Sequence, residues 1–494
     1  MLATAPRSTN ARERQLEREN RELRAENAAL KSRVSELEAR LTKFDEVEAK
    51  LAAVSERMAE LEARLKENSA SSHRPPSSDP PWNKPPQRKR EPTGRKRGAQ
   101  PGHEGAAREL VPVEQVDTVV PLFPADCRRC GAALPRRKTT DGTPPRRHQV
   151  VEIPPGKPKI TEYQIHATPC SCGAVTCAEL PAEAQSSFGP GLQARVALLT
   201  GRYRLSRREA VDAVKDLFGV ELALGSITSL EQATSDALEA PYNEALEAVR
   251  QAEVVHADET GWRNVNMRAW LWIAATTNLA VFWIDPRRNR DAFLRFLGAL
   301  AGFLITDRWG AYVRHARRRH QLCWAHLKRD FEKLLLRGGQ AKKLGNALLA
   351  QVKAMFELWH LFEADEIGRP TLCRHMAPIK KRVRALLVAG THNSHKKARG
   401  LCARLLPVWT CLWVFLRVPG VEPTNNVGER DLRKAVLWRK GSFGSQSAGG
   451  CLYVSRILTA AASLRKQRRN VLDFLETAIR AHREGLPAPS LLAA

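Results

Sequence analysis

The chain has 494 residues, 43% of them hydrophobic, so it is long and apolar enough to bury a sizeable core in several domains. It carries 80 Lys and Arg against 53 Asp and Glu, and the net charge of +27 favours a polyanionic partner, nucleic acid before an anionic membrane surface. The sequence has neither a run of about 18 apolar residues nor an apolar signal core after Met1, which argues against a membrane span and secretion and predicts a cytoplasmic, nucleoid-associated protein.

The N-terminal part predicts a disordered end over residues 1–10 and a coiled coil over residues 11–67. Leucines recur every seventh residue along one seam, at Leu16, Leu23, Leu30 and Leu37. Asn20 and Asn27 on the alternate line of this seam favour a parallel dimer with a defined register. A lone charged helix is the alternative, but it would leave the apolar seam in water. We therefore expect a homodimer or higher oligomer held by this segment.

Residues 68–108 are rich in Pro, Ser and Gly, and this composition predicts a linker without a core of its own. Its cations have a spacing that suits a phosphate backbone better than base edges, at Arg88, Lys89, Arg90, Arg95, Lys96 and Arg97. We predict that they contact DNA; a merely solvated basic linker is the alternative.

Four cysteines within residues 109–180 have the spacing of two metal-binding knuckles, Cys127-x-x-Cys130 and Cys170-x-Cys172. Cysteines of a cytoplasmic chain stay reduced, so close pairs argue for metal instead of disulfides. Runs 148–153 and 159–166 look like strands, and two knuckles on a small β scaffold suit a tetrahedral, structural Zn²⁺. The second pair is one residue short, with Cys177 as a substitute ligand, so a remnant site that no longer closes is the alternative.

Residues 181–250 predict a helix-turn-helix-like pair of helices. Ser206 and Glu209 can form a capping box, Gly219 is placed to end the first helix, and a second helix can start at Ser226. Exposed polar residues of the second helix would face a DNA groove, at Thr228, Ser229 and Gln232. The connection is longer than the tight turn of the usual motif, so an ordinary helical hairpin is the alternative.

Two apolar strand candidates end on acids. "VVHAD" ends at Asp258 and "FLITD" at Asp307, and two further strand candidates after Asp258 suggest a meander. Neighbouring strands of one sheet would bring both carboxylates together, where they repel each other unless a cation lies between them. Hard oxygen ligands of this kind suit Mg²⁺ or Mn²⁺. Glu259 should alternate to the other face of its strand, so we expect Glu259→Gln to be mild.

A third acid, Glu429, lies in the first turn of a predicted helix that Asn425 or Asn426 can cap. Four stretches that occur in this order, "HADETGWR", "TDRWGAY", "CWAHLKRDF" and "TNNVGERDLR", resemble the transposases of the insertion sequence 66 family. The stretch "RKRGAQPGHEG" and the cysteine pairs extend the resemblance, which covers the chain from Arg95 to the C-terminus.

The resemblance implies an α/β, RNase H-like catalytic core in two parts, residues 251–330 and 421–450. A helical insertion over residues 331–420 would separate them, and a helical region over 451–494 would follow. The DDE triad of the family maps onto Asp258, Asp307 and Glu429, which would hold Mg²⁺ or Mn²⁺. Such enzymes cut and join DNA strands without a covalent protein–DNA intermediate. The implied partners are the terminal repeats of the element, target DNA and accessory proteins of the same element.

Several residues close to these motifs allow two interpretations. Arg430 and Arg433 can position phosphate or form salt bridges within the core. Cys323 and His326 do not complete a zinc site, and we expect them to pack a helix against the active site. Arg308 stands where the family pattern suggests Gly, and its cation would crowd the metal site or hold a phosphate.

The predicted function is a transposase that binds element ends and catalyses metal-dependent strand cleavage and strand transfer. The rival is a catalytically silent, transposase-derived DNA-binding regulator, against which the complete triad argues. A nuclease of the same fold would share the metal chemistry but would not join strands.

Overall fold

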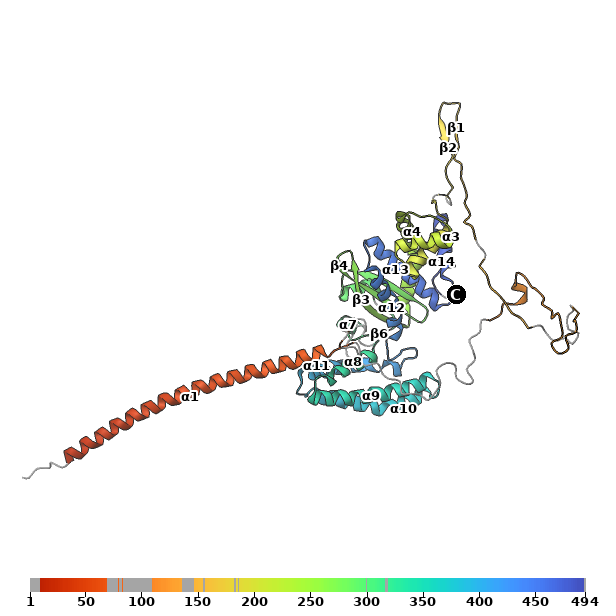
Figure 1. The fold of residues 1–494 in the computed structure, drawn as a ribbon. Coiled ribbons are helices and arrows are strands. Elements are labelled where there is room, and N and C mark those ends of the chain that lie inside the picture. Colours follow the sequence, from red (N-terminus) through yellow and green to blue (C-terminus); the bar gives the residue numbers. More distant parts are fainter. Residues whose placement is uncertain are drawn as a thin grey trace, which may run out of the picture. The chain divides into compact units, whose positions relative to one another are not determined.

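The computed structural model describes residues 9–68, 79, 82, 109–135, 146–153, 156–181, 184, 186–298, 300–315 and 319–492 (Figure 1). The predicted disordered end, residues 1–10, lies almost entirely outside this set, and so do the six predicted DNA-contacting cations between Arg88 and Arg97. The chain divides into two compact units. One comprises Met1–Pro85, Tyr163–Asp212 and Leu222–Ala494, and the other comprises Pro86–Glu162 and Ala213–Glu221.

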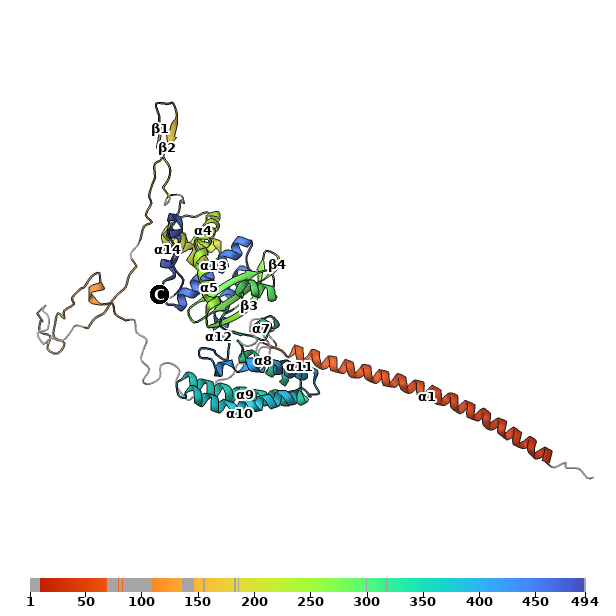
Figure 2. The same cartoon turned by 180° about the vertical axis from the view of Figure 1, so that it is seen from behind.

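The N-terminal segment is one continuous helix, α1 (Thr9–Leu65), which Figures 1 and 2 show as a long rod. The predicted helix is therefore confirmed. Its leucine seam is open to solvent in the single chain, with Leu23 58% and Leu37 55% exposed. The dimer that would cover this seam stays a prediction.

The cysteine-rich region has less β structure than predicted. A short 3-10 helix, η3 (Val113–Gln115), precedes the first cysteine pair, and strands β1 (Ala167–Pro169) and β2 (Val175–Cys177) form an antiparallel hairpin around the second. The predicted strands over 148–153 and 159–166 are wrong. Their apolar side chains are exposed, and no segment of the described chain pairs with them.

A run of helices follows: α2 (Pro190–Ala197), a π-helical turn (Leu198–Arg202), α3 (Arg207–Phe218), α4 (Leu224–Ala237) and α5 (Glu239–Gln251). The predicted capping box is confirmed, because the Ser206 N–H donates to Glu209 Oε2 at 2.7 Å and the Glu209 N–H donates to Ser206 Oγ at 3.2 Å. Gly219 ends α3 with a φ of 67°, as predicted. Helix α4 starts at Leu224 instead of Ser226, since the Ser226 N–H already donates to the carbonyl of Ala223.

A five-stranded mixed sheet forms the centre of the first unit, in the order β5-β4-β3-β6-β7. Its strands are β3 (Val254–Asn264), β4 (Met267–Ala275), β5 (Ala280–Asp285), β6 (Phe303–Thr306) and β7 (His320–Leu322). The first three form the predicted antiparallel meander, and β6 and β7 continue the sheet in parallel with β3. Strand β3 does not end at Asp258 as predicted, because the residues from Glu259 to Asn264 pair with β4.

Helices cover both faces of this sheet. On one face α12 (Asn426–Ser442) packs against β3 and β4, and the indole N–H of the buried Trp262 donates to Ser445 Oγ just beyond α12 at 3.1 Å. On the other face lie α6 (Arg290–Leu297) and α7 (Gly310–His315). There Tyr312 of α7 packs edge-on against Trp272 of β4.

The β5 edge of the sheet is covered by α13 (Ala448–Lys466). The Ala280 N–H donates to Ser463 Oγ at 3.0 Å, and the Phe282 N–H donates to Thr459 Oγ1 at 2.9 Å. These hydroxyls satisfy edge groups that would otherwise invite pairing with another chain. The last helix, α14 (Val471–Glu484), packs against α2 and α4.

Between β7 and α12 the chain forms a helical insertion whose hydrophobic cluster also takes in Ile305 of β6 and Leu322 of β7. It comprises α8 (Trp324–Leu335), α9 (Gly339–Glu363), α10 (Arg369–Gly390), α11 (Lys396–Leu405), and two 3-10 helices, η6 (Leu406–Leu412) and η7 (Val414–Leu416). Helices α9 and α10 lie side by side in both ribbon views (Figures 1 and 2). The segment Lys396–Leu416 is long and apolar enough to cross a membrane by length and composition, but 56% of its window is buried inside the protein, as in the core of a folded domain.

Candidate active site

The register of the sheet places Asp258 and Asp307 opposite each other. Parallel strands β3 and β6 pair up to His256 and Ile305. Two residues further along both chains, the same register sets Asp258 against Asp307, which directly follows the end of β6. Neighbouring strands lie about 4.8 Å apart, so the two carboxylates meet where the parallel ladder ends.

Glu429 lies in the first turn of α12, and its charge acts on Asp258. Its N–H donates to the carbonyl of Asn425, the N-cap residue, at 3.0 Å. The predicted side-chain cap is wrong, because the buried Asn425 amide is used elsewhere: Nδ2 donates to the carbonyl of Ala257 at 2.9 Å, and Oδ1 lies 3.1 Å from His256 Nδ1. This amide therefore ties the start of α12 to the strand that carries Asp258.

The electrostatics of Asp258 reflect the convergence of these acids. Burial raises the pKa of Asp258 well above its usual value, and the charges of Glu259, Asp307 and Glu429 raise it further. Such a group of carboxylates is costly to ionise without a compensating cation. Hard oxygen ligands of this kind suit a divalent metal, and metal binding by the three acids stays a prediction.

Glu259 alternates to the opposite face of β3, as predicted. There its side chain, 2% exposed, forms an ion pair with Arg288 at 2.5 Å and accepts a hydrogen bond from the hydroxyl of Tyr312. Burial and then the charge of Asp307 raise the pKa of Glu259. The effect of Asp307 indicates that Glu259 lies closer to the acids than expected.

Helix α8 carries two side chains to Glu429. His326 Nδ1 lies 3.5 Å and Arg329 Nη2 lies 3.6 Å from Glu429 Oε1. The ligand atoms of Cys323, His326 and Glu429 lie within 4.8 Å of one another. Cys323 itself is buried, which raises the pKa of its thiol to about 12, and its Sγ accepts the N–H of Asn425 at 3.2 Å. With Glu429, Cys323 and His326 thus form a group that could hold a metal ion, and the expected packing of α8 against the acids stays a prediction.

The cation next to Asp307 is paired with another carboxylate. Arg308 Nη2 forms an ion pair with Asp330 of α8 at 2.8 Å, and Asp307 Oδ1 accepts the N–H of Trp309 at 2.8 Å. Arg308 therefore connects the loop after β6 to α8, and the expected crowding of the acids does not follow.

Arg430 and Arg433 are exposed on α12, on either side of the buried Asp431. Asp431 takes its ion pairs from Lys434 at 3.1 Å and Lys466 at 2.9 Å. The salt bridges within the core are therefore formed by these lysines. Both arginines face solvent, and their contact with phosphate stays a prediction.

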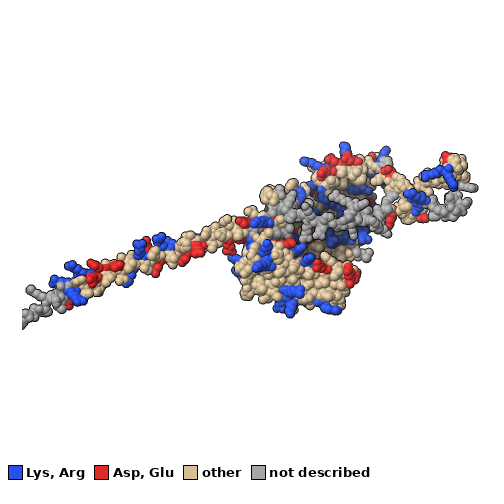
Figure 3. Space-filling model, turned by 60° about the horizontal axis from the view of Figure 1, so that its bottom comes forward, with Lys and Arg blue, Asp and Glu red and all other residues tan. Residues whose placement is uncertain are grey.

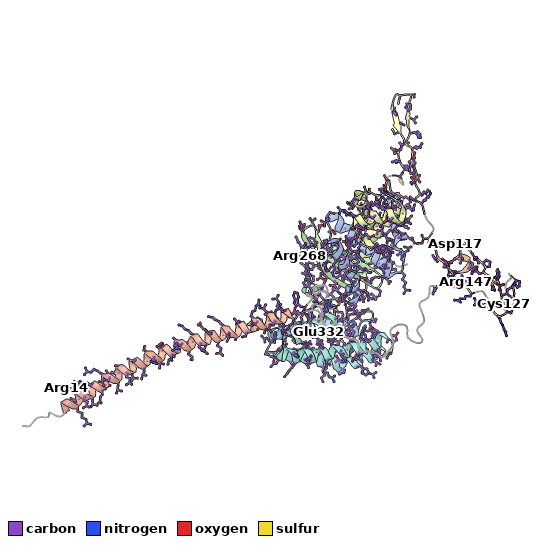
Figure 4. The ribbon with its side chains drawn as sticks, in the orientation of Figure 1. Arg14, Asp117, Cys127, Arg147, Arg268 and Glu332 are labelled. Atoms are coloured by element: carbon purple, nitrogen blue, oxygen red, sulfur yellow. The ribbon has the colours of Figure 1, made fainter. Side chains whose placement is uncertain are left out.

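Each cysteine pair forms a tight turn by itself. At Cys127 (Figure 4) the carbonyl accepts the N–H of Gly131 at 2.9 Å, and the carbonyl of Cys170 accepts the N–H of Gly173 at 2.9 Å. Hydrogen bonds from nearby backbone N–H groups lower the pKa of Cys127 and of Cys170, which favours the thiolate form that binds metal. A shared Zn²⁺ on Cys127, Cys130, Cys170 and Cys172 stays a prediction.

Cys177 does not fit the role of substitute ligand. It pairs with Ala167 at the open end of the β1-β2 hairpin, three residues along the strand from Cys170. That separation is about 10 Å at 3.3 Å per residue, which is too far for both sulfurs to bind one ion.

The predicted groove-reading residues Thr228, Ser229 and Gln232 are exposed on α4. Gln232 Nε2 donates to Asp236 Oδ1 at 3.0 Å. The helical pair and its exposed face are as predicted, and contact with DNA stays a prediction.

Arg329, Arg288 and Tyr312 were missed as members of the candidate site. Arg329 follows His326 by three residues inside "CWAHLKRDF", a spacing that places both on one helix face. Tyr312 lies inside "TDRWGAY", and Arg288 follows β5 in a loop that gave no signal.

A family model described as Transposase IS66 family matches residues 185–452, more than half of the chain. The chain belongs to the IS66 family of transposases. A second model, described as a family of unknown function, matches residues 3–109 of this transposase, which hold α1. The chain is also 25% identical over 440 residues to an uncharacterized protein, y4qI, of Sinorhizobium fredii, which covers 80% of this transposase and 77% of the relative. Membership of the family implies a function in transposition.

Proposed function

We propose that this transposase is a DDE enzyme that cuts the ends of its element and joins them to target DNA, with Asp258, Asp307 and Glu429 as its metal-binding triad. The observation that carries the proposal is that the register of β3 and β6 sets Asp258 against Asp307, while burial, then Glu259, Asp307 and Glu429 raise the pKa of Asp258. Two acids from distant parts of the chain thus act on Asp258 in a mixed α/β core, which supports an RNase H-like fold.

Divalent cations fit this site chemically. Asp258, Asp307 and Glu429 offer only carboxylate oxygens, the donors that Mg²⁺ and Mn²⁺ prefer. Their mutual repulsion would be relieved by such a cation. When bound, the metal would activate water or a DNA 3′-hydroxyl and stabilise the leaving oxygen.

The protein's own groups fix the acids in place. Asn425 anchors the start of α12 to β3, and His326 and Arg329 orient the carboxylate of Glu429. Arg308 and Asp330 connect the loop of Asp307 to the same helix, α8. This frame would position the triad before DNA binds.

The remaining parts would bind DNA and assemble the protein. We assign DNA contacts to the linker cations, to the exposed face of α4 and to Arg430 and Arg433. We assign dimerisation to α1 and structural zinc to the cysteine pairs. Domain limits follow the predicted ones, with a coiled coil to residue 67, a linker to 108, a zinc module to 180 and a DNA-binding helical region to 250.

The test is Mg²⁺-dependent nicking and joining of DNA that carries the element's ends, beside a binding assay at fixed salt. Glu429→Gln keeps the size of the side chain and removes a charge, so cleavage should be lost while binding stays. Asp258→Asn and Asp307→Asn should behave alike. Glu476→Gln on α14 is a matched control, because Glu476 is 34% exposed and Glu429 33%.

A parent protein that binds ends but cuts under no divalent metal would favour the silent regulator. Cleavage without joining would favour a nuclease. Cleavage by Glu429→Gln at the parent rate would refute the triad.

A further inference from the structure

The second half of the helical insertion has an unusual charge pattern. From Arg369 to Val421 the sequence contains 11 Lys and Arg and no Asp or Glu, although the whole chain has 53 acids. Cations in this segment therefore have no acidic partner within it. Figure 3, with the bottom of the molecule turned forward, shows Lys and Arg, with Asp and Glu towards one side, over a mostly uncharged surface of the lower lobe, which holds α9 and α10. A surface of this kind attracts a polyanion.

Part of this surface forms a shallow, open groove. One face of α10 and the side of η6 line a groove of about 690 Å³, with Lys380, Lys381, Arg384, Ala385, Val388, Ala389 and Trp409 along it. We call it the α10 groove. Residues four apart on α10 lie above one another on this face. The cations therefore lie towards one end of the groove and the small apolar residues towards the other.

Trp409 is the aromatic wall of the α10 groove. It is half-buried, so part of its ring surface is accessible, and its ring packs against Trp413 with 5.6 Å between centroids. Lys380 Nζ in turn lies 5.6 Å from the centroid of Trp413. The tryptophan pair is therefore held in place next to a cation, without a ligand.

Cations beside an apolar, aromatic wall fit an unpaired nucleotide better than a duplex. In a duplex the faces of the bases are stacked and out of reach, so it would use the cations alone. An unpaired strand can place a base on an aromatic ring while its phosphates meet Lys and Arg. An acidic peptide would match the cations but would not need a flat aromatic surface.

We propose that the α10 groove binds an unpaired DNA strand, with a base on Trp409 and phosphates on Lys381 and Arg384. The inference rests on the proposed function, which supplies cut strands near the element's ends. The groove and the acids belong to one compact unit, and α8, at the start of the insertion, contacts Glu429. A strand held in the groove would thus be part of the DNA on which the acids act.

The experiment measures binding of the full-length protein to fluorescent oligo-dT and to a duplex of the same length, by anisotropy, without added divalent metal. Trp409→Ala should weaken oligo-dT binding about 5- to 100-fold, the range of one base–aromatic stack, and leave duplex binding unchanged. Trp409→Phe keeps a ring and should retain most of the affinity. Circular dichroism melting checks that each variant is folded.

Charge reversal tests the phosphate contacts. The pair Lys381→Glu and Arg384→Glu should weaken oligo-dT binding and lower the slope of log affinity against log salt by about 1.4 for two contacts. The matched control is Lys342→Glu with Lys343→Glu, two exposed cations of α9 outside the groove.

Unchanged oligo-dT binding by Trp409→Ala, or equal losses in the two double variants, would overturn the proposal. So would equal losses for duplex and single strand. If the same substitutions remove binding to anionic lipid vesicles but spare oligo-dT, the groove is a membrane surface instead. Because no metal is added, these results do not depend on cleavage, which the Glu429→Gln assay tests separately.

Discussion

Asp258→Asn should make the metal-free protein more stable at neutral pH and abolish its stabilisation by Mg²⁺. The folded state raises the pKa of Asp258 well above its usual value, through burial and through Glu259, Asp307 and Glu429. The folded protein therefore holds this proton more tightly than the unfolded chain. Stability from this group is present below the usual Asp pKa and is lost as pH rises towards the folded pKa. Asn carries no charge, so the variant escapes this loss.

Both the gain in stability without metal and the loss of stabilisation by Mg²⁺ are large enough to measure. Each unit of raised pKa corresponds to about 1.4 kcal/mol of lost stability once Asp258 is ionised. A cation that binds only the folded parent contributes about 2.7 kcal/mol at a concentration of 100 Kd. At roughly 2–4 °C per kcal/mol for a domain of 150–250 residues, the parent should gain about 5–10 °C in Tm with Mg²⁺, and Asp258→Asn almost none.

The assay is thermal unfolding at pH 7 as MgCl₂ or MnCl₂ is added, for the parent, Asp258→Asn and Glu259→Gln. Glu259→Gln is the neighbouring control, because the oxygens of Glu259 are bound by Arg288 and Tyr312, and its Mg²⁺ response should persist. The reasoning would be refuted if neither cation changed the Tm of the parent. It would also be refuted if Asp258→Asn melted at a lower temperature than the parent without metal.

Three other predictions concern separate parts of the chain. Light scattering should show a dimer or larger for the full chain, and a chain that starts at Ser69 should be smaller; two monomers at micromolar concentration would contradict the seam in α1. Metal analysis of freshly reduced protein should find about one Zn²⁺ per chain, reduced by Cys127→Ser, and an absence of zinc would leave the cysteines as a remnant. Burial lowers the pKa of His320 from 6.5 to about 3, so only the unfolded chain takes up this proton as pH falls below 6.5. The free energy of unfolding should then fall by about 1.4 kcal/mol per pH unit in this window, and His320→Gln should flatten the slope in denaturant titrations; an unchanged slope would contradict it.

The meeting of Asp258 and Asp307 was predictable because it depends on local pattern. Each acid follows an apolar run, and the parallel pairing of those runs up to His256 and Ile305 fixes the rest. The capping box at Ser206 was predictable for the same reason, since it lies within four residues of sequence.

The errors came from interactions between distant segments. Asn425 was expected to cap its own helix, but its amide is taken by Ala257 and His256, far away in sequence. Strand β3 runs past Asp258 because β4 pairs with it, which residue composition does not reveal. Runs 148–153 and 159–166 have the composition of strands but lack a partner, and a strand needs one.

The two ends of the helical insertion are fastened to each other. The Trp324 N–H donates to the carbonyl of Pro423 at 2.9 Å, and the Asn425 N–H donates to Cys323 Sγ at 3.2 Å. The chain thus leaves the sheet and returns to it at nearly one point, and the hydrophobic cluster of the insertion takes in only the edge of the sheet, at Ile305 and Leu322. Insertions whose ends lie close together are tolerated well by the host domain. Over evolution the part of the insertion beyond α8 is free to lengthen, shorten or change its surface, and so to acquire new specificities, while α8 keeps its contacts with Glu429 and Arg308.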